Sequence, residues 1–312
     1  FVGSCKMRFE EKKIGVLMGG LSPEREVSLV SGNAVLEAIK RKGLKGVGID
    51  VSADIAFALK KNKVEVAFIA LHGVFGEDGS IQGLLEYAKI PYTGSGILAS
   101  AVSYDKVKSK EIFKFNGIPT ADYQVFFREE KEKQERLLGF PVVVKPSNQG
   151  SSIGVSVVKE AKEWEAALGL AFSYSKEILV EKFIKGKLLA IGMRGEQPLP
   201  IIHIQPKSGF YDYESKYTCG KTEYVCPADL SKEEIRCCED IAVKVYRALR
   251  GNGMPRVDVI LDKEGVPYVL EMNTIPGMTQ TSLLPMAAKQ SGITFDDLVV
   301  RILKSAKLNC EG

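Results

Sequence analysis

Short apolar runs alternate with amphipathic segments along the first third of the chain. The run from Ile14 to Met18 ends at a pair of glycines, and Ser22 followed by Pro23 then predicts a helix start with the serine as its cap. A second run, Val64 to Leu71, leads through a glycine-containing loop into another helical pattern. Strands that alternate with helices predict a parallel sheet whose binding loops lie at the carboxyl ends of its strands.

The pattern changes near Ser103, where a lysine-rich helical segment from Tyr104 to Phe115 begins. Beyond it, two strand patterns flank a loop rich in glycine and serine, Pro146 to Ser152, so this loop connects a strand to a strand. After Gly186, short strands alternate with an aromatic-rich loop, Phe210 to Tyr224, and a long helix follows. These changes predict three domains, at residues 1–102, 103–185 and 186–312.

Length and composition are those of a globular protein, with 312 residues of which 45% are hydrophobic and 26% charged. The net charge of +4 arises from 43 basic and 39 acidic residues spread along the chain. The chain has no block of like charge of the kind that nucleic-acid binders carry. No apolar run approaches the roughly 18 residues of a membrane helix. We therefore expect a cytoplasmic protein that binds a small anionic ligand, and neither nucleic acid nor membrane.

The six cysteines include no pair with C-x-x-C spacing, and only two histidines are present to complete a zinc site. We therefore expect reduced thiols that play no chemical part. The spacing of Cys219 and Cys226 around a loop would permit a disulfide in a hyperthermophile, and the sequence leaves that alternative open.

The strongest chemical signal is the segment from Arg256 to Asn273, in which two apolar strands flank a turn. With a connection of two or four residues, Asp258 opposes Val269 and Arg256 opposes Glu271. The side-chain period of two then puts these three polar residues on one face together with Asn273. Two carboxylates and an amide form an oxygen set that suits Mg²⁺ better than zinc. The alternative is a structural ion pair of Arg256 with Glu271, against which the flanking apolar residues argue.

A second signal is Lys145 at a strand end, followed by the small residues of the loop Pro146 to Ser152. Backbone N–H groups of such a loop can surround phosphate oxygens. The residue order is wrong for a Walker A loop, and the segment leads into a strand rather than a helix. We interpret it as a hairpin that folds over a nucleotide, with a plain surface turn as the alternative. Lys106 and Lys182 are further candidate contacts of a nucleotide, each weak by itself.

Three other positions can bind an amino acid. Glu24 lies near a predicted helix start, where a carboxylate can bind an ammonium group, and His72 follows a predicted strand. The alternative for Glu24 is stabilisation of the helix dipole by about 0.3–1 kcal/mol, and for His72 it is a hydrogen-bonded core position. The segment Asn273 to Leu283 is rich in hydroxyl and backbone donors that can hold a carboxylate, with an ordinary Pro-Gly turn as its alternative.

Several segments combine these signals in a fixed order: Gly19 to Ser28, Ala70 to Gly73, Pro91 to Gly96, the Lys145 loop, Phe210 to Glu214, and Glu271 to Met286. Together they resemble the D-alanine:D-alanine ligases of the ATP-grasp superfamily, and the match spans nearly the whole chain. The resemblance implies α/β and α+β domains in a three-domain ATP-grasp architecture. An N-terminal Rossmann-like parallel sheet would face the amino acids, and ATP would be held between the central and C-terminal sheets. It also implies homodimers formed through the first domain.

The same resemblance implies roles for single residues. Contacts of ATP would be Lys106, Lys145, Ser152, Glu181 and Lys182, with Glu181 near the adenine and Lys216 reaching the γ-phosphate. Two Mg²⁺ ions, for which Mn²⁺ can substitute, would be held by Asp258, Glu271 and Asn273. The first D-alanine would be bound by Glu24, Ser151 and Tyr217, with His72 as a further substrate contact. Arg256 and the Gly277 N–H would stabilise an oxyanion, and Ser282 with the Leu283 N–H would hold the second substrate's carboxylate.

The implied reaction is the ATP-dependent joining of two D-alanines through D-alanyl phosphate, for peptidoglycan precursor synthesis. The loop from Phe210 to Tyr224 would be the lid that excludes water. Relatives that use D-lactate tend to lack a tyrosine at the position of Tyr217, so its presence favours D-alanine as the second substrate. One position departs from the family pattern, since Leu188 stands where a glutamate would bind the ribose hydroxyls.

Other functions stay open at this point. A different ATP-grasp ligase, which uses D-lactate or another amino acid, would share all ATP and Mg²⁺ residues. A nucleotide-dependent dehydrogenase is suggested by the opening strand and glycine pair, but no G-x-G-x-x-G follows, and Asp258 and Glu271 would have no role. A non-catalytic nucleotide sensor is disfavoured because Lys145, Lys216 and Arg256 accompany the metal-binding set.

Overall fold

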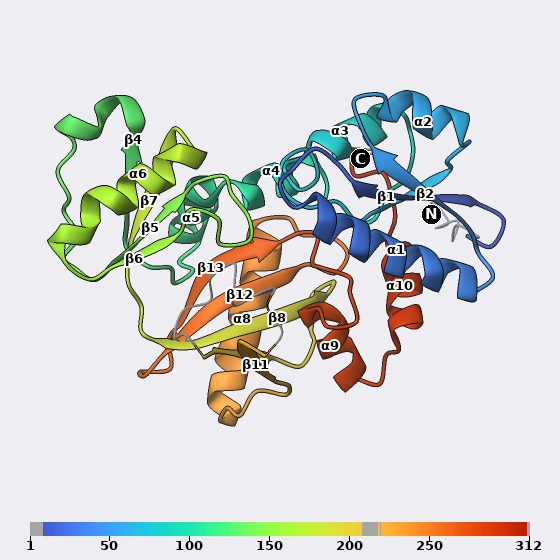
Figure 1. Cartoon of the computed structure of the whole chain (residues 1–312). Helices are drawn as coiled ribbons and strands as arrows, with labels where there is room; N and C mark the ends of the chain where they lie inside the picture. The colour runs from blue at the N-terminus through green and yellow to red at the C-terminus, as the bar shows by residue number, and fades with distance from the viewer. Residues whose placement is uncertain (1–8, 208–217, 219, 311–312) are drawn as a thin grey trace.

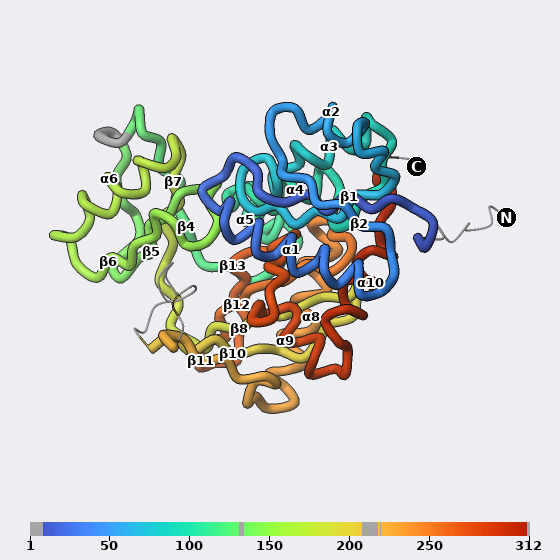
Figure 2. The backbone as a smooth tube through the Cα atoms, turned by 45° about the vertical axis from the view of Figure 1, so that its right-hand side comes forward, coloured from blue at the N-terminus to red at the C-terminus, as the bar shows by residue number. Residues whose placement is uncertain are grey.

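The computed structural model describes residues 9–207, 218 and 220–310, and its elements gather into three groups, each built on a sheet of its own. In Figure 1 the first group lies at upper right, the second at upper left, and the third below and between them. Figure 2 shows the second group standing to one side, connected to the others through helix α5 and the strand that opens the third group. The chain therefore surrounds a junction to which all three groups contribute.

The first group contains a parallel sheet in the order β2-β1-β3, with helices between the strands. Its elements are β1 (Lys13–Gly19), α1 (Arg25–Arg41), β2 (Lys45–Val51), α2 (Ile55–Lys61), β3 (Val66–Ile69) and α3 (Ser80–Tyr87). Strand β1 is buried at every residue from Ile14 onward, because helices and the third group cover both faces of the sheet. The prediction of a parallel sheet is confirmed.

The predicted cap of the first helix is wrong. Glu24, not Ser22, is the N-cap residue of α1. The Ser22 hydroxyl donates to the His72 carbonyl at 2.6 Å and accepts from the Glu24 N–H at 3.2 Å. Ser22 therefore joins the two loops at the carboxyl ends of β1 and β3 and does not cap the helix.

Two helices, α4 (Ile97–Tyr104) and α5 (Lys106–Phe115), lead from the first group to the second. The prediction of one helix from Tyr104 to Phe115 is wrong, because the chain is extended at Asp105, which separates α4 from α5 and caps α5. Its carboxylate accepts the N–H groups of Val107 and Lys108, each at 3.0 Å. This break fixes Lys106 in the first turn of α5.

The second group is an antiparallel sheet in the order β4-β7-β5-β6. Its elements are β4 (Tyr123–Phe127), the 3-10 helix η1 (Arg128–Lys133), β5 (Val142–Pro146), β6 (Ser156–Val158), the 3-10 helix η2 (Ala161–Glu163), α6 (Trp164–Tyr174) and β7 (Glu177–Lys182). One face packs its valines and isoleucine against α6. The period of two puts Lys145 and Glu181 on the opposite face.

The third group is an antiparallel sheet in the order β11-β10-β8-β12-β13, with β9 paired to β8. Its strands are β8 (Gly186–Arg194), β9 (Gln197–Pro198), β10 (Ile202–Pro206), β11 (Thr222–Val225), β12 (Arg256–Asp262) and β13 (Pro267–Asn273). Helix α8 (Lys232–Ala248) covers one face, and α9 (Leu283–Gln290) packs on the other. The predicted strand-to-strand hairpin of Arg256 to Asn273 is confirmed.

The predicted register of this hairpin is wrong. Asp258 lies opposite Glu271, and Arg256 lies opposite Asn273. Near the turn, Val259 pairs with Val269, so the register shifts by one residue at a bulge between Asp258 and Val259. The shift still leaves the four polar residues of the hairpin as two directly opposed pairs, as the period of two requires.

The last helix, α10 (Phe295–Leu303), returns to the first group and packs on α1. Arg41 and Asp296 form a bidentate pair between these helices, with distances of 2.9 and 2.7 Å. Beyond α10, Lys307 forms a bridge to Tyr92. The third group is therefore tied to the first at the chain's end as well as at the junction.

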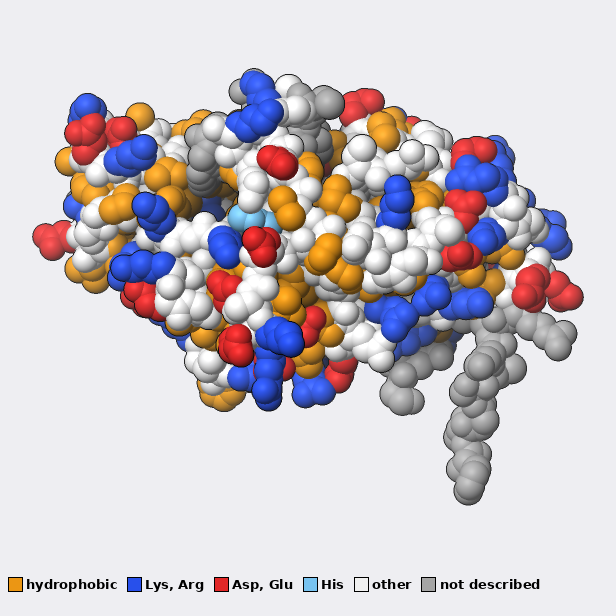
Figure 3. Space-filling model, turned by 90° about the horizontal axis from the view of Figure 1, so that it is seen from below, with side chains coloured by type: hydrophobic (Ala, Val, Ile, Leu, Met, Phe, Trp, Pro, Cys, Tyr) orange, Lys and Arg blue, Asp and Glu red, His pale blue; other side chains and the backbone are white. Residues whose placement is uncertain are grey.

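Acidic and basic side chains lie interspersed on the face shown in Figure 3. Within the described ranges, none of the helices combines the length and apolar composition that a membrane span requires. Cys226, Cys237, Cys238 and Cys310 are free thiols, and Cys219 lies outside the described residues.

Candidate active site

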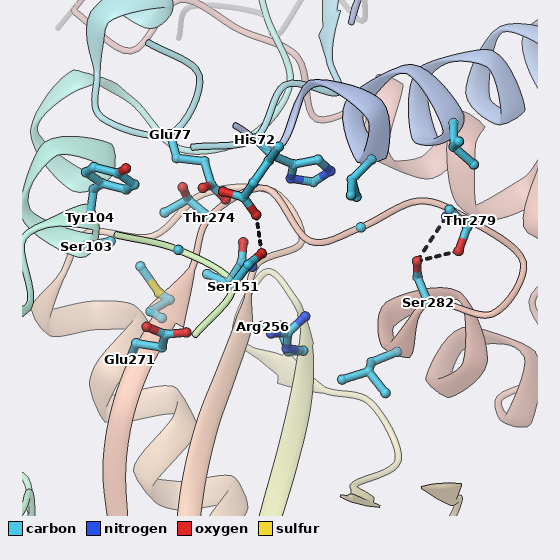
Figure 4. Close-up of a pocket in the computed structure, with 18 of the residues that line it drawn as sticks. His72, Glu77, Ser103, Tyr104, Ser151, Arg256, Glu271, Thr274, Thr279 and Ser282 are labelled. Carbon is cyan, nitrogen blue, oxygen red and sulfur yellow. Dashed lines mark hydrogen bonds between the residues drawn. The ribbon is translucent and has the colours of Figure 1, made fainter. Parts of the chain in front are cut away.

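A cavity of about 510 Å³ opens at the junction of the three groups (Figure 4). Its walls come from the start of α1, the loops after β3 and β5, α4, α5, the β12–β13 hairpin and the segment that leads into α9. Among the residues expected to have functional roles, those that line it are Glu24, His72, Lys106, Ser151, Arg256, Glu271, Asn273, Gly277, Ser282 and Leu283. Residues that are far apart in the sequence thus meet around one space.

Glu24 is buried at the wall of this cavity. Its carboxylate accepts a short hydrogen bond from the Ser151 hydroxyl, marked by the dashed line at Ser151 in Figure 4. A Cβ at Gly73 would lie 3.0 Å from Glu24 Oε2, and one at Gly150 would lie 2.8 Å from it. The backbone at these two glycines therefore packs closely against the carboxylate and restricts its position.

The loop after β3 places His72 beside Glu24. Gly73 has φ +71°, a conformation that favours glycine, and its N–H donates to Glu77 Oε2 at 2.8 Å. His72 is buried, and among the described residues its Nε2 has no hydrogen-bond partner. A buried polar atom without a partner is costly unless a ligand or water meets it, so His72 suits a polar ligand in this cavity.

The loop after β5 carries two consecutive residues with positive φ, Ser151 at 52° and Ser152 at 58°. Non-glycine residues rarely adopt this conformation, and such strain is concentrated at functional sites. Lys106 supports the loop, because its ammonium donates to the Gln149 carbonyl at 2.8 Å and its N–H donates to the Ser147 carbonyl at 3.1 Å. The loop is therefore held in an unfavourable conformation by α5.

The two hairpin carboxylates expected to hold a metal, Asp258 and Glu271, each contact a cation. Asp258 forms a bidentate pair with Arg256, with both distances 2.7 Å, and Glu271 Oε2 lies 3.1 Å from the Lys106 ammonium. The alternative pair of Arg256 with Glu271 is thus not the one that forms. No group of three or more His, Cys, Asp and Glu side chains in the described ranges is arranged to hold a metal ion. The hairpin instead offers two carboxylates and the Asn273 amide, an oxygen set that fits Mg²⁺.

The segment after the hairpin ends in a hydroxyl network at the start of α9. Ser282 is the N-cap residue, and its hydroxyl lies 2.7 Å from that of Thr279 and accepts the Thr279 N–H at 3.0 Å (Figure 4). A Cβ at Gly277 would lie 2.9 Å from Ser282 Oγ. The first N–H groups of a helix attract anions, and Leu283 at the start of α9 lines the cavity.

Lys145 and Glu181 lie beside the cavity and do not line it. The Lys145 ammonium is 2.8 Å from Glu181 Oε2, and both residues are buried. Lys110 approaches the other oxygen of the same carboxylate, with 2.9 Å between its Nζ and Glu181 Oε1. Burial alone would raise the pKa of Glu181, but the two ammonium groups together hold it below its usual range.

The remaining expected residues fall into two sets. Ser152, Lys182 and Asp258 are described but do not line the cavity, and Lys182 is exposed at the end of β7. Lys216 and Tyr217 lie outside the described residues, as does most of the expected lid from Phe210 to Tyr224. Tyr224 is described and lines the cavity.

Several residues that line the cavity received no functional role from the sequence, namely Glu26, Val27, Val30, Ser103 and Tyr104. Val30 is 58% exposed although it lies in an amphipathic helix, and an apolar side chain on the outer face was the available signal. The sequence gave no sign of a functional role for Tyr104, because it stands at the end of a helix where the pattern changes from apolar to polar residues. Burial raises the pKa of its phenol, and the nearby carboxylates of Glu77 and Glu24 raise it further.

Comparison with known proteins adds sequence relatives to this geometry. The family model described as D-ala D-ala ligase C-terminus matches residues 112–304, and that described as D-ala D-ala ligase N-terminus matches residues 51–95. A curated D-alanine–D-alanine ligase of Syntrophotalea carbinolica is 50% identical over 303 residues, covering 97% of this chain and 99% of that protein. One of Geobacter sulfurreducens is 51% identical over 302 residues, covering 96% of each.

Solved structures with the same fold include a D-alanine–D-alanine ligase of Bacillus anthracis, with a TM-score of 0.83 and 36% identity over 94% of this chain and 97% of that one. The ligase of that organism complexed with ATP has a TM-score of 0.81 and 34% identity, with the same coverage. The VanG D-Ala:D-Ser ligase of Enterococcus faecalis has a TM-score of 0.80 and 30% identity over 94% of this chain and 98% of that one. Ligases that differ in their second substrate thus share this fold.

Proposed function

The chain belongs to the D-alanine–D-alanine ligase family, and we propose that it joins two D-alanines into D-alanyl-D-alanine in an ATP-dependent reaction. Membership confirms the expected fold class of mixed α/β and α+β elements. The observation that carries the proposal is the single cavity in which Glu24, Glu271 and the start of α9 face one another. An ammonium site, a metal site and a carboxylate site in one space suit the ligation of two amino acids. The product is a precursor for peptidoglycan synthesis.

The ATP site in this proposal lies between the sheets of the second and third groups. Lys106 and Lys145 would contact the phosphates, with Ser152 and the strained loop above them, and Lys216 would reach the γ-phosphate. Glu181 and Lys182 at the end of β7 would meet the adenine. Supporting this assignment, Lys145 and Glu181 lie on the face of the second group's sheet opposite to the one that α6 covers.

The metal site would be formed by Asp258, Glu271 and Asn273, which would hold two Mg²⁺ or Mn²⁺ ions when nucleotide binds. Bound ions of this kind supply charge neutralisation at the transferring phosphoryl oxygens. The carboxylates currently contact Arg256 and Lys106, so both cations are near enough to turn to substrate oxygens. In the proposal, a bound ligand would therefore replace the present ion pairs of Asp258 with Arg256 and of Glu271 with Lys106.

The first chemical step transfers the γ-phosphoryl group of ATP to the carboxylate of the first D-alanine. Glu24 would hold that substrate's ammonium, with Ser151 and Tyr217 beside it and His72 as a further polar contact. The lysines offset the negative charge that spreads over the phosphoryl oxygens, and ADP leaves. The product of this step is D-alanyl phosphate, an acyl group activated for attack.

The second step is attack by the neutral amine of the second D-alanine on the acyl phosphate carbonyl. Ser282 and the Leu283 N–H would hold its carboxylate, which aims the amine at the carbonyl carbon. Arg256 and the Gly277 N–H would stabilise the oxyanion that forms. Collapse of the tetrahedral species expels phosphate and leaves the dipeptide after the amine has lost its proton.

Four further features complete the proposal. The domains would follow the sheets, at residues 1–102, 103–185 and 186–312, and two chains would associate through the first of them. The protein would act in the cytoplasm, where ATP is available. Ser282, Leu283 and Tyr217 would select D-alanine over D-lactate as the second substrate.

The test is phosphate release from ATP and Mg²⁺ with D-alanine alone, L-alanine alone, or D-alanine mixed with D-lactate or D-serine, with each product identified by mass. We expect release that depends on D-alanine and a product with the mass of D-alanyl-D-alanine. A depsipeptide or D-alanyl-D-serine as the main product would move the second-substrate assignment. A folded protein that binds ATP but releases no phosphate with any D-amino acid would refute the ligase proposal.

A further inference from the structure

A buried lysine outside the cavity completes the charge arrangement around the proposed ATP site. Lys110 lies on α5, one helical turn after Lys106, and only 1% of its surface is exposed. Its ammonium donates to the Thr120 hydroxyl at 2.5 Å and to the Ala121 carbonyl at 3.1 Å. It also lies 2.9 Å from Glu181 Oε1. Lysine is seldom buried to this extent unless it is paired, so the position has a specific role.

The contacts of Lys110 are those of an ammonium group. Three acceptor oxygens surround its Nζ, which matches the three donors of a protonated lysine. The face of the Tyr123 ring lies 5.3 Å away and adds a cation–π contact. Burial lowers the pKa of Lys110, while the Glu181 carboxylate opposes that change. Lys110 is therefore a cation in this site.

Glu181 is shared between two lysines, one on each carboxylate oxygen. A single carboxylate cannot neutralise two ammonium groups, so the set of Lys110, Lys145 and Glu181 has a net charge of +1. With Lys110 absent, Lys145 and Glu181 would form a neutral pair, and both oxygens of Glu181 would be available to Lys145. The positive charge at the Lys145 end of the set thus depends on Lys110.

The same lysine connects the two sheets that enclose the proposed nucleotide site. Thr120, which accepts from Lys110, donates to the Val269 carbonyl of β13 at 2.8 Å. The Val269 N–H in turn donates to the Pro119 carbonyl at 2.8 Å. Val269 stands two residues before Glu271, so Lys110 contacts β7 directly and the metal-binding strand through one hydroxyl.

We propose that Lys110 is a positioning residue which, by occupying one oxygen of Glu181, leaves Lys145 placed and charged for the phosphates of ATP. This inference rests on the proposed function only in taking ATP as the ligand of this cleft. Lys110 touches no ligand itself, because it is enclosed by α5, the segment that holds Thr120 and Ala121, and β7. Its effect reaches the nucleotide through Glu181 and Lys145.

A role through charge and a merely structural role predict different results for Lys110→Met. Loss of a charge acts on ligands in proportion to their own charge, so we expect the dissociation constant of ATP to rise about tenfold or more and that of neutral adenosine less than about twofold. The constants for adenosine, ADP and ATP are measured by calorimetry, with ADP expected between the other two. The KM for ATP should rise in step, while the KM for D-alanine stays within about twofold.

Three variants make the comparison specific. Lys108→Met makes the same change on the exposed face of α5, where Lys108 pairs with Glu111 at 2.9 Å, and should leave all three constants unchanged. Lys110→Arg keeps the charge and should retain the preference for ATP over adenosine. If Lys110→Met does not fold, Lys110→Gln is used, because its amide still donates to the Ala121 carbonyl while the charge is lost.

The outcomes separate the two proposals. A wild-type protein that does not bind ATP would overturn the proposed function and this inference together. If the wild type binds ATP and the neutral variants bind it equally well, only the role of Lys110 is refuted. Equal weakening of adenosine and ATP would also refute it, since that result indicates a general distortion of the cleft. Weakening that increases from adenosine through ADP to ATP would support it.

Discussion

The two sides of the nucleotide cleft both pair carboxylates with basic side chains, but in different surroundings. On the second group's sheet, Glu181 lies between Lys110 and Lys145 at 2.9 and 2.8 Å, and the three side chains are 4%, 1% and 9% exposed. On the hairpin, Glu271 lies 3.1 Å from Lys106, and these side chains are 31% and 12% exposed. The distances are similar, so they do not distinguish the two sides.

Solvent access makes the difference. A buried ion pair that loses one partner leaves an uncompensated charge, whereas a pair at a cavity wall can exchange its partner for water or a ligand. The hairpin carboxylates would therefore be able to give up a cation when the proposed Mg²⁺ and ATP bind. The Glu181 set is suited to stay fixed and to hold Lys145 at a constant position and charge. In the proposed site, one side of the cleft would rearrange on binding and the other would keep its geometry.

Glu271→Gln tests the hairpin side and should have the largest effect on activity. It removes a carboxylate from the proposed metal site, and we expect kcat/KM for phosphate release to fall about a thousandfold or more, as for loss of a principal electrostatic group. Excess Mg²⁺ should restore little of it, and the melting temperature should hardly change. The control is Asp262→Asn in the turn of the same hairpin, because its side-chain oxygen can still accept the Glu264 and Val266 N–H groups. An active Glu271→Gln variant would exclude a metal role for this residue.

Glu181→Gln tests the other side and should act mainly on stability. It leaves two buried ammonium groups without an anion, so the free energy of unfolding should fall by about 3–5 kcal/mol. Urea unfolding followed by circular dichroism measures this, with Glu111→Gln as a control that removes the exposed partner of Lys108 and should cause no measurable change. A free energy of unfolding equal to that of the wild type would show that Lys110 and Lys145 do not need the Glu181 carboxylate for stability.

The contribution of Glu181 to the free energy of unfolding should depend on pH, and Glu181→Gln measures that dependence. Because the pKa of Glu181 is lowered on folding, its ionised form stabilises the protein fully above the unfolded value of about 4.3, and this stabilisation is lost as pH falls below it. The stability difference between wild type and Glu181→Gln should be constant from neutral pH to about pH 5 and shrink under more acid conditions. A difference that shrinks already near neutral pH would mean a raised pKa.

The sequence was sufficient to predict many of the polar residues that line the cavity, because they stand in loops and at strand or helix ends, where binding residues are expected. Glu24, His72 and Ser151 are examples. It could not give the hairpin register, since the position of the bulge depends on how β12 also pairs with β8. The polar face survived that error because opposed residues share a face in either register.

Lys110 could not be recognised as functional for a different reason. It stands at the spacing of the buried positions Val107 and Phe113, where a lysine looks like an interruption of the apolar face of α5. Only the fold shows that Glu181, from a strand far along the chain, meets it there. An ion pair between distant segments leaves no local pattern in the sequence, whereas a loop or a strand end does.

Gly150→Ala extends the comparison to the third carboxylate of the junction, Glu24. The new Cβ would lie 2.8 Å from Glu24 Oε2, so the carboxylate must move, and we expect the KM for the first D-alanine to rise about tenfold. The KM for ATP should change less, because the atoms nearest to the new Cβ all belong to Glu24 and not to the lysines proposed to hold the phosphates. Gly169→Ala on the exposed face of α6, where a Cβ meets nothing within 4 Å, is the matched control. Unchanged kinetics with D-alanine would show that the position of Glu24 does not matter for that substrate.

The smallest expected effect concerns Leu188 of β8. Leu188 is half-buried and lies between Ile204 and Ile260 on the neighbouring strands, so this position offers no oxygen to the ribose hydroxyls. One hydrogen bond contributes about 0.5–1.5 kcal/mol, so its absence predicts that 2′-deoxy-ATP is used with a KM within about twofold of that for ATP. Leu188→Glu should then increase the preference for ATP severalfold, and Leu188→Met should not. If the wild type instead prefers ATP over 2′-deoxy-ATP by more than about tenfold, another group must hold the 2′-hydroxyl. The cleft would then contain a ribose contact that belongs to neither of the two carboxylate sets compared above.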